Sequence, residues 1–244
     1  RFGGGCPVRQ GRRLGGRGEL GGDRPAPSPA TSPYDRLMRA DPDSSTDATS
    51  LAEAMAAGPV VLDGGLATLL EAHGHDLTSA LWSARLLVED PDAIGAAHRE
   101  YFRAGAQVAI TASYQASLDG FAAIGVGAAD AERAMRRSVE VARAAADRSG
   151  RVGTPGEPGG ERATGPRWVA ASIGPYGAAL ADGSEYRGDY GRTEKELGAW
   201  HRPRLEILAE AGADLLACET VPSLAETEAL AAELAALGVP AWIS

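Results

Sequence analysis

Polar side chains that could do chemistry recur at the ends of short apolar runs. Asp63 closes the run PVVLD, and Glu219 closes the run DLLACE. A carboxylate at the end of an apolar strand is costly to bury unless it faces a polar cavity or a cation. Two such carboxylates in one place could bind an ammonium group or act as a general acid and base. Other polar residues follow apolar runs in the same way: Thr111, Ser113, Tyr114, Ser172, Tyr176 and Thr220.

Several of these residues also have plain structural interpretations. Asp63 before Gly64 and Gly65 could cap the next helix or shape a turn. Trp82, between two helical segments, is typical of a core or lid tryptophan. The charged segment 182–190 (DGSEYRGDY) could be a solvated loop, but its interleaved tyrosines favour a structured loop near the strand ends.

The cysteines and paired histidines give weak signals for a metal. Cys218 directly precedes Glu219, so on a strand their side chains point to opposite faces, and we expect Cys218 to pack in the core rather than act as a ligand or nucleophile. Cys6 is too far away in sequence to form a CxxC unit with it. His73 and His75 flank a glycine without a third ligand nearby and are expected at the surface. Two cysteines fit a reducing, cytoplasmic compartment.

The elements that position these residues alternate between short apolar runs and longer helical patterns. This alternation indicates a parallel sheet built from βαβ units. The first run ends in LDGGLATLL, whose glycines lack the spacing of a dinucleotide-binding turn, so a (β/α)8 barrel is favoured, with the strand ends converging on one mouth. Strands are predicted over 59–65, 107–114, 168–175, 214–220 and 240–244, and helices over 51–58, 67–74, 90–105, 129–149, 193–211 and 223–237.

Composition separates an N-terminal tail from the rest of the 244 residues. Residues 1–33 hold six arginines against two acids, whereas the whole chain has a net charge of −9. The acidic body argues against a nucleic-acid partner. We expect residues 1–50 to be disordered, with three interpretations: an RNA-binding arm, a transit peptide, or sequence without a selected role, which Met38 as the first methionine favours. No apolar run approaches the roughly 20 residues that span a bilayer, so we expect no membrane association.

Five segments, in order, resemble the homocysteine S-methyltransferase family. They are VVLDGGLATLLEAHGHDL, LWSARLL, HREYFRAGAQVAITASYQAS, SIGPYGAALADGSEYRGDY and DLLACETVPSLAE. The resemblance runs from Gly58 to Ser244 and is greatest to the bacterial and plant enzymes that use S-methylmethionine or S-adenosylmethionine. Segment 182–190 is characteristic of that branch.

The resemblance implies a (β/α)8 barrel in which three cysteine thiolates hold a zinc ion. Zinc binds the thiol of homocysteine and makes the thiolate available, and its sulfur attacks the methyl group of a sulfonium donor to give methionine. By the same resemblance, Asp63 and Glu219 hold the ammonium group of homocysteine. Gly64 and Gly65 let the backbone approach it. Three further residues match positions that line the mouth: Trp82, Thr111 and Tyr114.

The zinc-ligand motifs of the family, G-x-N-C and Gly-Gly-Cys-Cys, do not occur in this sequence. Residues 51–244 then correspond to the N-terminal part of the barrel, about five of eight βα units. We expect this fragment to be unable to catalyse methyl transfer alone and to be marginally stable, because residues 240–244 would expose a strand edge. A non-catalytic barrel fragment that binds an amino acid or its sulfonium derivative is the alternative. A Schiff-base barrel enzyme is disfavoured because Lys195, the single lysine, lies at a helix start.

Overall fold

A computed structural model describes residues 49–77, 82–149, 165–180 and 182–244. The predicted tail, residues 1–50, lies outside these ranges except for its last two residues, as does most of the glycine- and proline-rich segment 150–166. The described residues belong to one compact unit, Ala48–Ser244.

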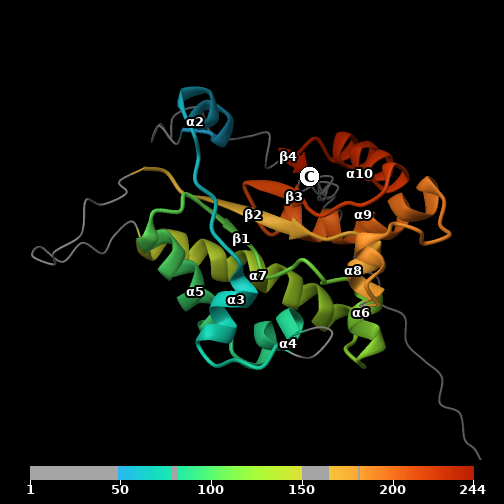
Figure 1. Ribbon diagram of the computed structural model, residues 1–244, viewed down its shortest axis with the longest axis horizontal. Coiled ribbons are helices and arrows are strands. Elements are labelled where there is room, and N and C mark those ends of the chain that lie inside the picture. Colours follow the sequence, from blue (N-terminus) through green and yellow to red (C-terminus); the bar gives the residue numbers. More distant parts are fainter. Residues whose placement is uncertain (1–48, 78–81, 150–164, 181) are drawn as a thin grey trace, which may run out of the picture. The chain divides into compact units, whose positions relative to one another are not determined.

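Helices and strands alternate along this unit (Figure 1). The strands are β1 (Val108–Ile110), β2 (Trp168–Ile173), β3 (Leu215–Cys218) and β4 (Ala241–Ile243). The helices are α2 (Leu51–Ala57), α3 (Leu66–Ala72), α4 (Trp82–Glu89), α5 (Pro91–Ala104), α6 (Leu118–Ala123), α7 (Ala128–Ser149), α8 (Tyr176–Leu180), α9 (Glu194–Glu210) and α10 (Leu224–Leu237), with a 3₁₀ turn at Ser184–Tyr186.

The sheet is parallel throughout and its strands follow chain order, β1-β2-β3-β4. Each crossover contains at least one helix, as expected for consecutive βα units. In register, Val108 lies opposite Trp168, and Ala170 lies opposite Leu215. The predicted α/β class with a parallel sheet is therefore confirmed, and the strand order is that of part of a (β/α)8 barrel.

The predicted strand over 59–65 is reduced to a single β-bridge between Leu62 and Val108. The segment bonds to β1 along one edge, where Val108 donates to the carbonyl of Val61 and accepts from the amide of Asp63. Val61 and Leu62 remain 53% and 48% exposed. Among the residues described, the segment is hydrogen-bonded to β1 along one edge only, and two of its apolar side chains are exposed. We infer that this lack of a second pairing partner is why the run does not form a full strand.

Polar side chains cap the starts of several helices. Ser50 forms a capping box with Glu53 at the start of α2, and Thr193 forms the equivalent pair with Glu196 at α9. The side chain of Asp90 accepts from an amide in the first turn of α5. The sequence prediction missed the short helices α4, α6 and α8, and Trp82, expected between two helical segments, is the first residue of α4.

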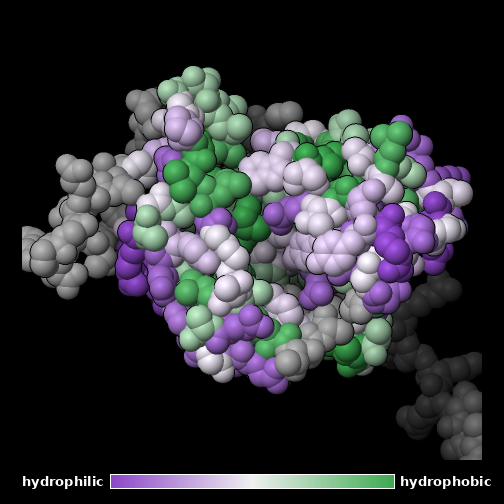
Figure 2. All heavy atoms as spheres, in the orientation of Figure 1, coloured by the Kyte–Doolittle hydropathy of each residue, from purple (hydrophilic) through white to green (hydrophobic). Residues whose placement is uncertain are grey.

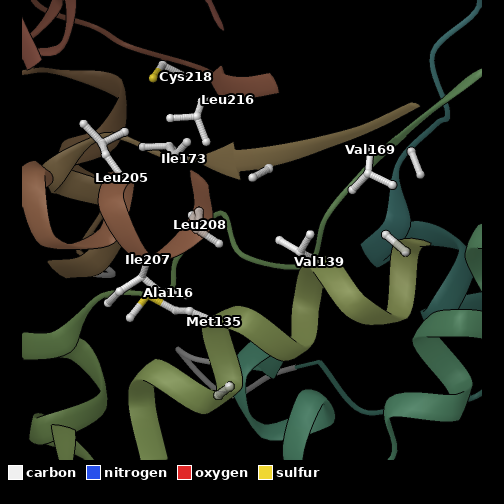
Figure 3. Packing of buried hydrophobic residues seen from close by; sticks show 14 of the residues in the cluster. Ala116, Met135, Val139, Val169, Ile173, Leu205, Ile207, Leu208, Leu216 and Cys218 are labelled. Atoms are coloured by element: carbon white, nitrogen blue, oxygen red, sulfur yellow. The ribbon is translucent and has the colours of Figure 1, made fainter. Parts of the chain in front are cut away.

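Alternate residues of the strands face two different apolar layers. Val108, Ala170 and Ala217 belong to a cluster against which Leu51 of α2 packs, and α2 lies on the other side of the sheet from α5 and α7 (Figure 1). The opposite face packs on α7, α9 and α10. Figure 3 shows residues from this second cluster, with Cys218 beside Leu216 on the sheet side.

An apolar groove of about 440 Å³ lies between α2 and the sheet, and Figure 2 shows hydrophobic residues gathered there. It is lined by Leu51, Met55, Gly58, Pro59, Val60, Leu62 and Trp242. Within the described ranges, no helix is both long enough and apolar enough to cross a membrane.

Candidate functional site

Asp63 directly follows the Leu62 bridge, and one of its two carboxylate oxygens is hydrogen-bonded while the other has no partner among the described residues. Its Oδ2 accepts a hydrogen bond from the Ile110 amide at 2.9 Å and lies 3.7 Å from Nδ1 of His98. Its side chain is only 2% exposed. Oδ1 is buried and has no hydrogen-bond partner among the described residues. This residue is therefore more than a helix cap: it is a buried acceptor with free capacity.

Glu219 follows β3 directly and is held from the neighbouring strand. The Ser172 hydroxyl of β2 donates a hydrogen bond to its carboxylate. Burial raises the pKa of Glu219, the Ser172 hydrogen bond opposes that rise, and the negative charge of Asp63 adds to it. The structure thus brings the two predicted carboxylates into one electrostatic environment.

Buried hydroxyls link β1 to β2 beneath the carboxylates. The Ser113 hydroxyl donates to the Ser172 carbonyl at 2.7 Å, so its oxygen accepts from Thr111 Oγ1, also at 2.7 Å. Thr111 Oγ1 in turn accepts from the Ser172 amide at 3.0 Å. Thr111, predicted to line the mouth, is only 3% exposed. It hydrogen-bonds to Ser172, the residue that donates to Glu219.

Tyr114 lies near the end of β3 and the segment 182–190. Burial raises the pKa of its phenol, a hydrogen bond with the Thr220 side chain lowers it, and the charges of Glu185 and Glu219 raise it further. Thr220 has a φ of 59°, which is rare for a β-branched residue and occurs at functional sites. The buried Arg204 guanidinium fixes the Tyr114 carbonyl at 2.9 Å. Tyr114 thus lies among the polar residues of the strand ends.

Gly64, Gly65 and Trp82 each contact protein groups in this structure. A Cβ on Gly64 would lie 2.9 Å from the Tyr101 ring, and the Tyr101 hydroxyl donates to the Gly65 carbonyl at 3.0 Å. In this structure Gly64 makes room for Tyr101. Trp82 packs against an apolar cluster that includes Leu70, which agrees with a core tryptophan.

The segment 182–190 is a structured loop, as its aromatic residues favoured. Asp182 accepts from the Ser184 amide at 2.9 Å. A Cβ on Gly177 would lie 2.4 Å from the Glu185 amide nitrogen, so the loop backbone packs directly on α8. Gly188, at φ 74°, packs against Ser223 at the start of α10.

The described residues do not fit a zinc ion. Cys218 is fully buried in the apolar cluster, and burial raises the pKa of its thiol to about 12, so it is held as a neutral thiol. His73 is at the surface, 3.3 Å from Glu100. Within the ranges described, no group of three or more His, Cys, Asp or Glu could hold a metal. The expectations for Cys218 and His73 are confirmed.

Sequence reasoning missed His98, and it missed the role of Ser172. Ser172 was among the polar residues at strand ends, but its bond to Glu219 is visible only when β2 and β3 are paired. His98 is fully buried on the face of α5 that also carries Ile94 and Phe102. A histidine on the apolar face of a helix is the signal that could have singled it out.

A family model described as Homocysteine S-methyltransferase matches residues 60–244. The chain belongs to the homocysteine S-methyltransferase family. It is 50% identical over 190 residues to a homocysteine S-methyltransferase of Escherichia coli, which covers 76% of this chain and 57% of the relative. It is 51% identical over 172 residues to homocysteine S-methyltransferase YbgG of Bacillus subtilis, covering 70% and 53%.

Solved structures of the family agree with this assignment. The metallated form of the homocysteine methyltransferase MmuM from E. coli superposes with a TM-score of 0.70 at 49% identity, covering 78% of this chain and 65% of that one. Its oxidized form gives a TM-score of 0.68 at 51% identity, covering 76% and 61%. The chain spans little more than half the length of the two bacterial relatives above.

Proposed function

We propose that this chain holds the amino-acid end of homocysteine, as the substrate-binding part of an enzyme that methylates the homocysteine thiol. The observation that carries the proposal is the buried Asp63 carboxylate, whose Oδ1 lacks a hydrogen-bond partner among the described residues. A buried carboxylate with free acceptor capacity is costly unless a cation pairs with it. An α-ammonium group supplies both the charge and the N–H donors.

The two carboxylates are prepared for this ligand in different ways. Ile110 orients Asp63 through its amide, and Ser172 orients Glu219 through its hydroxyl. Without a ligand the two acids repel, which is one reason why the pKa of Glu219 is raised. A cation bound between them would replace this repulsion by attraction to both and would favour the ionised form of Glu219.

The reaction that we propose for the whole enzyme is a displacement at carbon. The homocysteine sulfur, having lost its proton, attacks the methyl carbon of a sulfonium donor, either S-methylmethionine or S-adenosylmethionine. A new sulfur–carbon bond forms while the old one breaks, and its electron pair returns to the donor sulfur, which leaves as a neutral thioether. Support for a sulfonium donor comes from the family resemblance of segment 182–190.

The family resemblance also implies zinc as the activator of the thiol, and the described residues do not supply its ligands. We propose that these residues bind and orient homocysteine and that the chain alone does not complete methyl transfer. Methionine formation from homocysteine and S-methylmethionine in the presence of zinc tests this: turnover above background would contradict it. Binding of homocysteine without turnover is equally what a non-catalytic binder would show.

The binding proposal is tested with Asp63→Asn. Asparagine still accepts from Ile110 but lacks the charge, so the Kd for homocysteine, measured by calorimetry, should rise about tenfold to a hundredfold. The Kd for 4-mercaptobutanoate, which lacks only the amino group, should not change. Asp92→Asn, an exposed acid in the first turn of α5, is the matched control. An equal loss for both ligands, or no loss, would contradict the assignment.

A further inference from the structure

His98 is a buried titratable residue beside the proposed ammonium acceptor, Asp63. It lies on α5, its side chain is fully buried, and its Nδ1 is 3.7 Å from Oδ2 of Asp63. That distance is too long for a hydrogen bond. Neither Nδ1 nor Nε2 has a hydrogen-bond partner in the part of the chain that the structure describes. An unpaired buried imidazole is unfavourable, so a site that keeps one has a use for it.

The two oxygens of Asp63 face different groups. Oδ2 already accepts from Ile110 and faces His98, whereas Oδ1 is open. An ammonium group bound at Oδ1 would attract the carboxylate and could shift it. A second donor at Oδ2 would keep the carboxylate in position. Hydrogen bonds of this kind are often long without ligand and shorten in the complex.

We propose that His98 is a positioning residue for Asp63, and that its Nδ1–H closes on Oδ2 when the ammonium group of homocysteine binds at Oδ1. This inference rests on the proposed function, since it assigns how the same site recognises the amino group. His98 itself does not contact the ligand. Its effect is therefore confined to the part of the affinity that comes from the amino group.

Two arginines on the helices packed against α5 pair with carboxylates other than that of Asp63. On α4, Arg85 lies near Glu89. On α7, Arg136 pairs with Glu132 and Glu210. Among the described side chains, the carboxylate within ion-pairing distance of His98 is that of Asp63.

Two variants separate a polar role from a packing role. His98→Leu keeps most of the volume and removes the nitrogen, whereas His98→Asn loses volume and keeps an N–H donor near the position of Nδ1. We expect the preference for homocysteine over 4-mercaptobutanoate to fall about tenfold in His98→Leu, with an unchanged Kd for the analogue. His98→Asn should keep most of the preference.

The opposite order of the two variants, or an equal loss for both ligands, would show a packing role and overturn the inference. Asp63→Asn measured in parallel tells the two proposals apart. If that variant loses the preference and His98→Leu does not, only the role of His98 fails. If Asp63→Asn also keeps it, the ammonium site itself is wrong. Failure of the parent chain to bind either ligand overturns both.

A second measurement does not depend on a folded His98→Leu. Nitrogen-15 spectra of the four histidine rings can be recorded on the parent chain, with the His98 signals identified from His98→Asn. Homocysteine should shift the Nδ1 resonance of His98 as the new bond forms, and 4-mercaptobutanoate should leave it unchanged. Identical responses to both ligands would contradict the proposal.

Discussion

Two buried histidine–carboxylate pairs in this domain differ in the distance between their members. His201 Nε2 lies 2.8 Å from Glu226 Oε1, and the Tyr176 amide donates to the same carboxylate oxygen at 2.5 Å. His98 and Asp63, by contrast, stay 3.7 Å apart. Each pair keeps other buried atoms without a partner among the described residues, but only the first is closed by a bond between its members.

The two pairs differ in what their carboxylates bond to. Glu226 joins α10 to α9 and to the start of α8, so its bonds hold three elements together. Burial lowers the pKa of His201 although the bond to Glu226 opposes this. Among the described residues, the Asp63 carboxylate accepts a hydrogen bond only from the Ile110 amide, and its Oδ1, like Oε2 of Glu226, has no partner. Under the proposed function, the second pair is left unclosed because a ligand ammonium group completes it.

The largest expected effect comes from breaking the closed pair. Glu226→Ala leaves His201 and the Tyr176 amide buried without their acceptor, so the free energy of unfolding should fall by about 3–5 kcal/mol. Urea unfolding followed by circular dichroism measures it. Glu228→Ala, exposed on the same helix, should change it by less than about 0.5 kcal/mol. If both variants cost the same small amount, the pair does not stabilise the fold as described.

An intermediate effect should appear at the open site as a dependence on pH. Because folding raises the pKa of Glu219 above its ordinary 4.5, its contribution to stability is present below that value and is lost as pH rises through the raised one. Glu219→Gln escapes this loss, so the variant should be more stable than the parent at neutral pH. The gain should shrink as pH falls toward 4.5.

Unfolding curves for parent and variant across this pH range give the gain directly. Glu228→Gln is the control and should show no such trend. A gain that is the same at every pH would mean that the ionisation of Glu219 is not the cause.

The smallest effect is expected from a third histidine pair at the surface. His73 Nε2 lies 3.3 Å from Glu100, and both side chains are substantially exposed. His73→Ala should change the free energy of unfolding by less than about 0.5 kcal/mol, and salt should remove even that. A loss as large as that of Glu226→Ala would contradict the ranking of pairs by burial.

Local chemistry explains which parts of the fold could be predicted. The starts of α2, α5 and α9 depend on Ser50, Asp90 and Thr193, each within three residues of the amide it caps, so the sequence alone shows them. The run 59–65 has the composition of a strand, but its state depends on what pairs with its two edges. That information lies elsewhere in the chain.

The site divides in the same way. Asp63 and Glu219 are visible in sequence because each interrupts an apolar run. His98 is not, and Ser172 is visible only as one polar residue at a strand end, because the roles of the two arise from contacts with residues 35 positions back and 47 positions on, respectively. The glycines after Asp63 were assigned to the ligand by resemblance, whereas in the structure Gly64 accommodates Tyr101. Spacing along the chain shows which residues share a sheet edge, but not which ring fills the space beside them.

The buried thiol of Cys218 offers a chemical probe of local opening in this domain. With its pKa raised to about 12 and its side chain enclosed by the helix layer, it reacts with an alkylating reagent only while that layer is open. In a chain carrying Cys6→Ser, every labelled molecule records one such opening. The labelling rate under native conditions therefore reports how readily the helix layer opens over β3, without any spectroscopic tag.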